Sequence, residues 1–382
     1  MIYRRGGAFL DTCSLEISIG SPPEAEVMAP PEAAEPVLSA VQAVVTRKCN
    51  LSCLYCNVRL SGDGESTMTR ETMERALEAA ATAGGGRLFM VTGGEPLLEP
   101  EITFELLERA GPPSVLFTNG TLIDRSMALR IKAAGASPVV SMDGLSRRHD
   151  PARCGTWSRV AAGLSQLREA GVEFGLSAVV TADNIRHLDS DMEKLHEMFG
   201  PTGMGFNILH WTPEGFFPVS GEDYAEAMGR VFRKALETGV FVDQIARRIS
   251  PLVTGRYRHR DCSAMGGKIV FHPDGVVSNC ISSRVWEDWR GRMPSSMEHC
   301  RDCPAAGICG GGCAWDGIHL GRAGGPDERH CLWTRRILDL FLEDAAASFP
   351  PGPVTRRMLT ERYGSMITRG STPLGTSIGH RS

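Results

Sequence analysis

Cysteine is the residue type whose spacing carries chemistry in this chain. Three of the twelve cysteines, Cys49, Cys53 and Cys56, form a C-x3-C-x2-C run. Three thiolates that hold one cubane iron–sulfur cluster leave one of its four irons without a protein ligand. That iron can bind a small molecule and pass it an electron. The run therefore predicts a redox centre with an open coordination position.

A second set of cysteines lies near the C-terminus. Its members are Cys262, Cys280, Cys300, Cys303, Cys309, Cys313 and Cys331. Zinc is the alternative for such a set, because C-x2-C pairs are common in zinc ribbons. Disulfides would need an oxidising compartment, and Asp11 and Glu16 interrupt the N-terminal stretch where a secretory signal would be apolar. The upstream C-x3-C-x2-C run favours iron–sulfur clusters for both sets.

Together the two sets resemble those of radical S-adenosylmethionine (radical SAM) enzymes with a C-terminal SPASM extension, many of which modify peptides. The SPASM pattern is Cys, a gap, Gly, four residues, Cys, then C-x2-C-x5-C-x3-C and a last Cys. Here Cys262, Gly275 and Cys280 match its first part. The other five cysteines of the set match the C-x2-C-x5-C-x3-C run and the last Cys with the same spacing. The resemblance covers the chain from about residue 41 to about residue 340.

The resemblance also implies which cysteines share a cluster. The outer auxiliary cluster would take Cys300, Cys303, Cys309 and Cys331, and the inner one Cys262, Cys280 and Cys313. Some members have a further cysteine six residues before the first, where this chain has Arg256. The inner cluster therefore lacks a fourth thiolate, and His259, Asp261 or a substrate group could complete it. The implied cofactors are three 4Fe-4S clusters, one of them the radical SAM cluster, and S-adenosylmethionine.

A glycine-rich turn is the next candidate for cofactor binding. Gly93, Gly94, Glu95 and Pro96 resemble the family's GGEP motif, whose backbone and glutamate hold the amino group of S-adenosylmethionine. Glycine lets the backbone approach a ligand closely, and the Glu95 carboxylate could accept hydrogen bonds from an ammonium. An ordinary turn between strand and helix is the alternative.

Four further side chains are implied to contact the cofactor. They are Tyr55, Asn119, Ser141 and Arg153. Tyr55 matches an aromatic residue near the adenine, and Ser141 matches a serine near the ribose or carboxylate. Asn119 could contact the cofactor, although Asn-Gly is also a common turn pair. Arg153 matches loosely an arginine that pairs with the methionine carboxylate, because Cys154 beside it departs from the pattern. Cys13 and Cys154 are given no role.

Alternating strand and helix patterns must position these residues. Apolar runs predict strands at 41–45, 87–91, 114–117, 138–141, 175–180 and 205–209, and amphipathic runs predict helices at 70–81, 101–110, 126–134, 160–170 and 189–198. Repeated strand–helix units imply a parallel sheet with right-handed crossovers. The series resembles the partial (β/α)6 TIM-like barrel of the radical SAM family, and the resemblance implies an α/β fold in which this barrel is followed by a small iron–sulfur SPASM domain. Ligands of such folds gather at the carboxyl ends of the strands.

We expect four segments along the chain. They are an N-terminal strand and linker at 1–38, the radical SAM partial barrel at 39–240, the SPASM auxiliary-cluster domain at 241–345 and a C-terminal tail at 346–382. Residues from about 250 to 345 show few long periodic segments, so metal is expected to support their folding. Residues 350–382 contain Pro, Gly and Ser and are expected to be poorly ordered.

Composition limits the classes of partner. The 382 residues carry a formal net charge of −4, which disfavours nucleic acid, and no apolar run reaches membrane-spanning length. We therefore expect a cytoplasmic protein. A reductant such as flavodoxin or ferredoxin would be a partner, as would a precursor peptide or a small-molecule substrate. Against a peptide substrate, the roughly forty residues before the barrel are too few for the usual leader-peptide-binding domain, so a separate leader-peptide-binding protein would be a further partner.

The expected activity is reductive cleavage of S-adenosylmethionine to a 5′-deoxyadenosyl radical, which abstracts hydrogen from a substrate C–H bond. The SPASM resemblance favours a thioether or carbon–carbon crosslink on a ribosomally made precursor peptide. The alternative is oxidation or epimerisation of a small molecule such as a sugar. Ile281 stands where sulfatase-maturing members place an aspartate, which disfavours that reaction. The intact first run with the GGEP turn disfavours a non-catalytic iron–sulfur or zinc scaffold.

Overall fold

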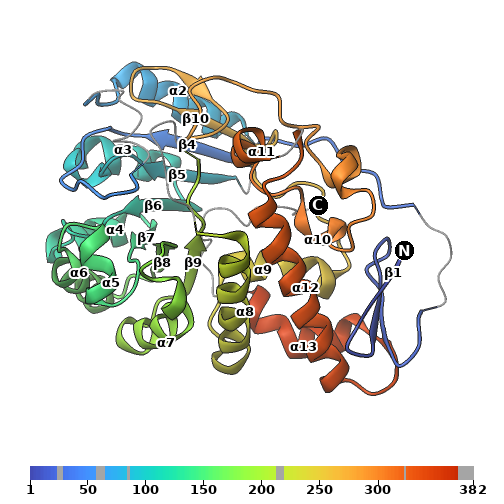
Figure 1. Ribbon diagram of the computed structural model, residues 1–382. Coiled ribbons are helices and arrows are strands. Elements are labelled where there is room, and N and C mark those ends of the chain that lie inside the picture. Colours follow the sequence, from blue (N-terminus) through green and yellow to red (C-terminus); the bar gives the residue numbers. More distant parts are fainter. Residues whose placement is uncertain (24–28, 57–64, 84–86, 212–218, 322–323, 369–382) are drawn as a thin grey trace. The chain divides into compact units, whose positions relative to one another are not determined.

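The computed structural model describes residues 1–23, 29–56, 65–83, 87–211, 219–321 and 324–368 (Figure 1). These residues fall into two compact units, and neither is continuous in sequence. One unit combines 36–218 with 266–288, and the other combines 1–35, 219–265 and 289–369. The four segments expected from the sequence do not coincide with these units. Within the expected cluster domain, residues 241–265 and 289–345 belong to one unit and residues 266–288 belong to the other.

The unit that contains 36–218 is built on a parallel sheet. Its six central strands are β4 (Ala40–Val44), β5 (Leu88–Thr92), β6 (Ser114–Thr118), β7 (Ser137–Ser141), β8 (Gly175–Val179) and β9 (Gly203–Asn207), each paired with the next in parallel. All six lie where the apolar runs predict them. Their near-continuous burial is typical of strands covered on both faces. The α/β class and the six parallel strands are thereby confirmed.

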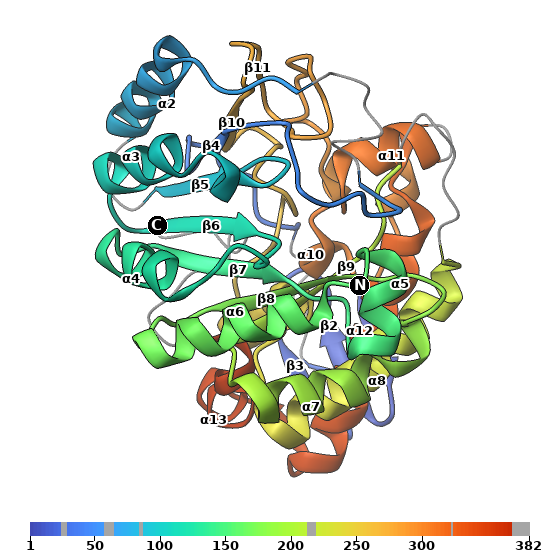
Figure 2. The same cartoon turned by 90° about the vertical axis from the view of Figure 1, so that its left-hand side faces the viewer.

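Helices follow these strands and lie along one side of the sheet (Figure 2). They are α2 (Arg70–Thr82), α3 (Pro100–Ala110), α4 (Arg125–Ala133), α5 (Ser146–Ala152), α6 (Trp157–Ala170) and α7 (Leu188–Phe199). Thr69 and Asp124 cap α2 and α4 by accepting backbone N–H groups of the first turn. Gly171 and Gly200 end α6 and α7 in the left-handed conformation. Only the short α5 was not expected.

Two strands from much later in the sequence extend the same sheet. Strand β10 (Lys268–Phe271) pairs in parallel with β4, and β11 (Val277–Ser278) returns antiparallel to it. Residues 266–288 were expected in the cluster domain, yet they belong to the unit that contains 36–218. Cys280 follows β11 and therefore lies in the same unit as Cys49, Cys53 and Cys56.

The other unit combines a small antiparallel sheet with helices. The sheet has the order β1 (Ile2–Arg5), β2 (Ala8–Asp11), β3 (Ile17–Ile19) and β12 (Gly352–Val354). The helices are α8 (Gly221–Thr238), α9 (Asp243–Thr254), α10 (Ala306–Cys309), α11 (Ala314–Leu320), α12 (Glu328–Ser348) and α13 (Arg356–Ile367). Helix α12 packs along α8, where the buried rings of Tyr224 and Trp333 meet edge to face. Its 21 residues were not expected as one helix.

The expected C-terminal tail is ordered over its described part. Residues 350–368 form β12 and α13 instead of a disordered end, and 369–382 lie outside the described residues. Thr355 caps α13. Leu359, Tyr363 and Met366 then recur at helical spacing and are buried, with the Tyr363 ring 4.4 Å from that of Phe341. The Pro and Gly residues before this helix hid that pattern.

No helix among the described residues is both long enough and apolar enough to cross a bilayer.

Candidate functional site

A cavity of about 270 Å³ opens at the carboxyl ends of the six central strands. Its lining includes the sequence-predicted residues Cys49, Cys53, Cys56, Tyr55, Gly93, Gly94, Asn119, Ser141 and Arg153. Each of the six strands, or the loop that follows it, contributes to the wall; β8 and β9 do so through Val179 and Asn207. Two predicted residues, Glu95 and Pro96, are buried outside this lining.

The three thiols of the first run share this cavity. Leu51 donates its backbone N–H to the Cys49 sulfur at 3.4 Å, and the Asn119 side-chain amide approaches the same sulfur at 3.9 Å. Burial raises the pKa of Cys49 and raises that of Cys53 to about 11. Without a metal these two thiols would stay protonated at neutral pH. Three soft donors in one cavity, two of which need a metal to ionise, fit a cluster ligand set better than a nucleophile.

The glycine pair of the GGEP turn packs directly on the backbone that leads into the cysteine run. Gly94 donates its N–H to the Thr46 carbonyl at 2.7 Å, and Glu95 donates its own to the Lys48 carbonyl at 2.8 Å. A Cβ atom on Gly93 would lie 2.5 Å from the Thr46 oxygen, and one on Gly94 would lie 2.2 Å from the Lys48 oxygen. Only glycine fits here, so the turn braces the cysteine loop.

Glu95 does not point into the cavity. Its carboxylate accepts hydrogen bonds from the Leu97 N–H at 3.0 Å, the Thr118 hydroxyl at 2.8 Å and the Asn119 N–H at 2.7 Å. Burial raises the pKa of Glu95 to about 7, and these three donors oppose that rise. The sequence suggested an acceptor for the ammonium of the cofactor. The structure places the carboxylate under the loop after β6, where it fixes Asn119.

Asn119 connects the end of β6 to the cysteine loop. Its side-chain N–H donates to the Asn50 amide oxygen at 2.9 Å, while its own amide oxygen accepts the Thr121 N–H at 2.9 Å. Asn119 therefore acts as a link between two loops of the cavity wall, in addition to lining the cavity.

Asp143 is a site residue that the sequence reasoning missed. Its buried carboxylate accepts the Tyr55 hydroxyl, the Arg153 Nε–H at 2.8 Å and the Val179 N–H at 2.9 Å. The Arg153 guanidinium also lies 5.4 Å from the centre of the Tyr55 ring. One carboxylate thus fixes two residues of the cavity wall. Its position two residues after Ser141 at the end of β7 was the available signal.

A neutral histidine supports the same corner. The Asp143 N–H donates to His149 Nδ1 at 3.3 Å, so the proton of the neutral ring lies on Nε2. That nitrogen donates to the Thr156 hydroxyl at 3.0 Å, and the hydroxyl donates to the Arg153 carbonyl at 2.7 Å. Burial lowers the pKa of His149 to about 4. The chain of bonds holds the backbone of Asp143 and Arg153 in place.

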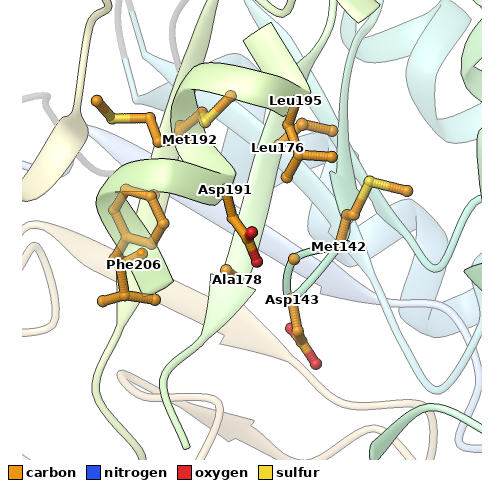
Figure 3. Close-up of a pocket in the computed structure, with 12 residues that line it drawn as sticks. Met142, Asp143, Leu176, Ala178, Asp191, Met192, Leu195 and Phe206 are labelled. Carbon is orange, nitrogen blue, oxygen red and sulfur yellow. The ribbon is translucent and has the colours of Figure 1, made fainter. Parts of the chain in front are cut away.

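A second, much smaller cavity has Met142 and Asp143 in its wall, and Figure 3 shows the side chains that surround it. Its volume is about 10 Å³, room for one water molecule at most. Asp191, which forms a buried ion pair with Arg148, is part of its wall. This space cannot hold a cofactor or substrate, so the cavity at the cysteine run is the candidate site.

The other compact unit brings together four cysteines of the second set, Cys300, Cys303, Cys309 and Cys331. Burial raises the pKa of Cys331 to about 12, and the neighbouring thiols of Cys309, Cys300 and Cys303 add to that rise. Arg335 donates a hydrogen bond to the Cys303 sulfur. All twelve cysteines of the chain are free thiols. The four sulfurs have the donor chemistry of a second cluster site.

Cys262 and Cys313 lie near each other in this same unit. Cys313 precedes α11, and burial raises its pKa well above the usual value. Of the two side chains suggested as a further ligand, Asp261 binds the Arg248 guanidinium through both oxygens, at 2.6 and 2.7 Å. The His259 ring lies 4.9 Å from that of Tyr257. Asp261 is therefore engaged by an arginine and is not available as a cluster ligand.

Comparison with known proteins agrees with the cysteine pattern. Residues 43–197 match the model of the Radical SAM superfamily. Fe-coproporphyrin III synthase of Methanosarcina barkeri (strain Fusaro / DSM 804) is 32% identical over 160 residues, which are 40% of this chain and 40% of that protein. Radical SAM cyclopropyl synthase TigE of Paramaledivibacter caminithermalis is 22% identical over 320 residues, 72% of this chain and 68% of that protein. The chain spans only about half, or less, of the length of curated relatives such as the Fe-coproporphyrin III synthase.

Two solved structures have the same fold over most of the chain. Native anSMEcpe with bound AdoMet and Cp18Cys peptide has a TM-score of 0.67 at 22% identity, covering 82% of this chain and 100% of that chain. Streptococcus suis SuiB bound to precursor peptide SuiA has a TM-score of 0.60 at 15% identity, covering 77% and 76%. Residues 43–197 match the Radical SAM superfamily, and the fold of the chain resembles that of these two peptide-bound structures.

Proposed function

We propose that the chain is a radical SAM enzyme that reductively cleaves S-adenosylmethionine and abstracts hydrogen from a C–H bond of a ribosomally made precursor peptide. The observation that carries the proposal is one cavity whose wall holds Cys49, Cys53 and Cys56 beside the residues expected to contact the cofactor. A 4Fe-4S cluster on these thiolates would supply a strongly reducing electron to S-adenosylmethionine at its open iron.

Arg153 is suited to the carboxylate of S-adenosylmethionine. It lines the cavity, and among its guanidinium N–H groups only Nε–H donates a hydrogen bond to a described residue, Asp143. The two Nη groups are left to form paired hydrogen bonds with a ligand carboxylate. Asp143 holds the guanidinium in one orientation, so less side-chain freedom is lost when the ligand binds. Ser141 lines the same cavity and would contact the ribose or carboxylate.

The amino group of the cofactor needs another acceptor than Glu95. Glu95 is buried under Asn119 and outside the cavity lining, whereas Gly93 and Gly94 bring backbone to the wall. We therefore assign the ammonium to backbone carbonyl groups of this turn. Tyr55, fixed through its hydroxyl by Asp143, would lie against the adenine. In this arrangement Glu95 and Asp143 position residues that touch the cofactor.

The second set of cysteines would hold two auxiliary 4Fe-4S clusters. Cys300, Cys303, Cys309 and Cys331 supply four thiols for the outer one. Cys262 and Cys313 would supply two thiols for the inner one; Cys280, the third thiol expected from the sequence, belongs to the other unit, and Asp261 is engaged elsewhere. The inner cluster would then keep an iron for a ligand other than Asp261, such as a peptide cysteine. These clusters could accept the second electron when the substrate radical is oxidised.

A peptide is favoured as substrate by the extent of the matches. The anSMEcpe and SuiB structures, each with a bound peptide, have the same fold over 82% and 77% of this chain. A tetrapyrrole is the second candidate, because a relative named for coproporphyrin is more identical, at 32%, over a shorter stretch of 160 residues. A flavodoxin or ferredoxin would supply electrons, and a separate leader-peptide-binding protein would assist a peptide substrate.

The test uses the full chain, reconstituted with iron and sulfide under anaerobic conditions. With dithionite and S-adenosylmethionine it should release methionine and 5′-deoxyadenosine, and the variant with Cys49, Cys53 and Cys56 all replaced by Ala should release none. Deuterated candidate peptides encoded near the gene, and deuterated coproporphyrin III in parallel, then identify the donor by transfer of deuterium into 5′-deoxyadenosine. Stoichiometric zinc with little iron after anaerobic purification would refute the proposal. Transfer from the porphyrin alone would favour the second candidate.

A further inference from the structure

A buried cluster of charges lies in the unit that carries the outer cysteines. It contains three guanidinium groups and two carboxylates, those of Arg247, Arg248, Arg258, Asp243 and Asp261. None of these side chains is more than 15% exposed. Three positive and two negative charges leave one net positive charge. A charge removed from water to this degree is costly, and its interactions with neighbouring charges are screened little.

Arg248 is the most strongly fixed of the three arginines. Its side chain is 1% exposed and donates to both oxygens of Asp261, at 2.6 and 2.7 Å. Its Nε–H donates to the Thr334 hydroxyl at 3.0 Å, and its guanidinium lies 4.5 Å from the centre of the Trp333 ring. These contacts come from α12 and from the segment before Cys262. The guanidinium therefore has one orientation.

The same contacts place this charge beside the cysteine segments. Asp261 directly precedes Cys262, and its N–H donates to the Gly310 carbonyl at 2.8 Å. Gly310 directly follows Cys309 and has no room for a side chain, since a Cβ atom would lie 2.5 Å from the Asp261 nitrogen. The Arg248–Asp261 pair is therefore joined by one backbone hydrogen bond to the segment that carries Cys309. The group of five buried charges, with its net positive charge, lies beside this segment.

We propose that Arg248, positioned by Asp261, supplies the buried positive charge that sets the reduction potential of an iron–sulfur cluster held by Cys300, Cys303, Cys309 and Cys331. The inference rests on the proposed function, since it needs that cluster. A thiolate-bound cluster is anionic, and reduction adds one more negative charge. A fixed cation nearby stabilises the reduced form, so it raises the potential. Arg335 donates to Cys303 from a more exposed position, so water and salt screen its charge more strongly.

The test is an anaerobic redox titration followed by electron paramagnetic resonance. The parent is the full-length chain with Cys49, Cys53 and Cys56 replaced by Ala, so that only auxiliary clusters respond. Arg248→Gln should make the potential of one cluster more negative at unchanged iron and sulfide content. Arg248→Lys, which keeps the charge, should remain near the parent. Arg357→Gln removes an exposed arginine of α13 and should change nothing.

Asp261→Asn gives a second, oppositely signed test. It removes the negative partner and leaves the guanidinium charge, so the potential should become less negative. This variant decides the question if Arg248→Gln fails to retain iron. An unchanged potential in both variants, or equal shifts in the Gln and Lys variants of Arg248, would overturn the inference. A parent that shows no iron–sulfur signal at all would instead refute the proposed function.

Discussion

The carboxylate of Glu95 accepts the backbone N–H of Asn119 at 2.7 Å, and the side chain of Asn119 in turn reaches the cysteine loop. Glu95 was expected from its motif to contact the cofactor, but its carboxylate instead fixes Asn119, which is a residue of the cavity wall. Gly93 and Gly94 of the same motif pack on the backbone before Cys49. The motif organises the loop that carries the first thiol, and the cavity wall depends on this packing.

Glu95→Ala should weaken binding of S-adenosylmethionine by about tenfold, or about 1.4 kcal/mol, because Asn119 loses its fixed position. Asn119→Ala should cost a similar amount. The double variant should cost little more than either single one, since both changes remove one shared link. Equilibrium binding to reconstituted protein, compared at equal iron content, measures the cycle. Fully additive losses would show that Glu95 contacts the cofactor independently of Asn119.

Replacing Cys49, Cys53 and Cys56 together by Ala should lower the iron content by about four of about 12 atoms per chain, the stoichiometry of three 4Fe-4S clusters. The three thiols line one cavity, so removal of all three should abolish one cluster and leave the others. Iron and sulfide analysis after anaerobic reconstitution measures the loss. Cys154→Ala is the control, because this exposed thiol accepts the Ser52 N–H and lies outside the run. A loss of four irons in the control would contradict the assignment.

The strands and the first cysteine run could be predicted from the sequence because both are local patterns. The six apolar stretches at regular spacing form β4 to β9. Cys49, Cys53 and Cys56 follow the first of these strands and line the cavity at its carboxyl end. The pairing of β10 with β4 could not be predicted, because Ile269 and Val41 are partners across more than two hundred residues. Nor was α13 recognised, since Tyr363 acquires its partner only when Phe341 of α12 packs against it.

At the site, residue types were easier to predict than side-chain directions. The spacing placed Glu95 correctly on the loop after β5, but whether its carboxylate faces a ligand or Asn119 depends on packing between loops. Asp143 was overlooked for the same reason. Its partners Tyr55 and Arg153 come from different loops, and only the fold brings them together.

His149 should make folding stability depend on pH. Burial lowers its pKa to about 4 in the folded chain, from the ordinary histidine value of 6.5. The unfolded chain then binds the proton more readily, so the contribution is complete above pH 6.5 and is lost as the pH falls toward 4. Relative to His149→Gln, which does not titrate, the native chain should lose about 2 kcal/mol of stability between pH 7 and pH 5. Anaerobic denaturant titrations at both pH values measure this, and parallel changes in the two proteins would contradict it.

Arg153→Lys should weaken binding of S-adenosylmethionine by roughly tenfold or more, because lysine keeps the charge but cannot form paired hydrogen bonds with a carboxylate. Binding of 5′-deoxyadenosine should change little, since it lacks the methionine carboxylate that the Nη groups would hold. Calorimetry with both ligands on the reconstituted chain gives the two affinities. Tyr55→Phe is the matched control: it removes the hydrogen bond from the Tyr55 hydroxyl to Asp143 and leaves the guanidinium in place. Equal loss of affinity for both ligands in Arg153→Lys would show that Arg153 only supports the wall of the cavity through Asp143.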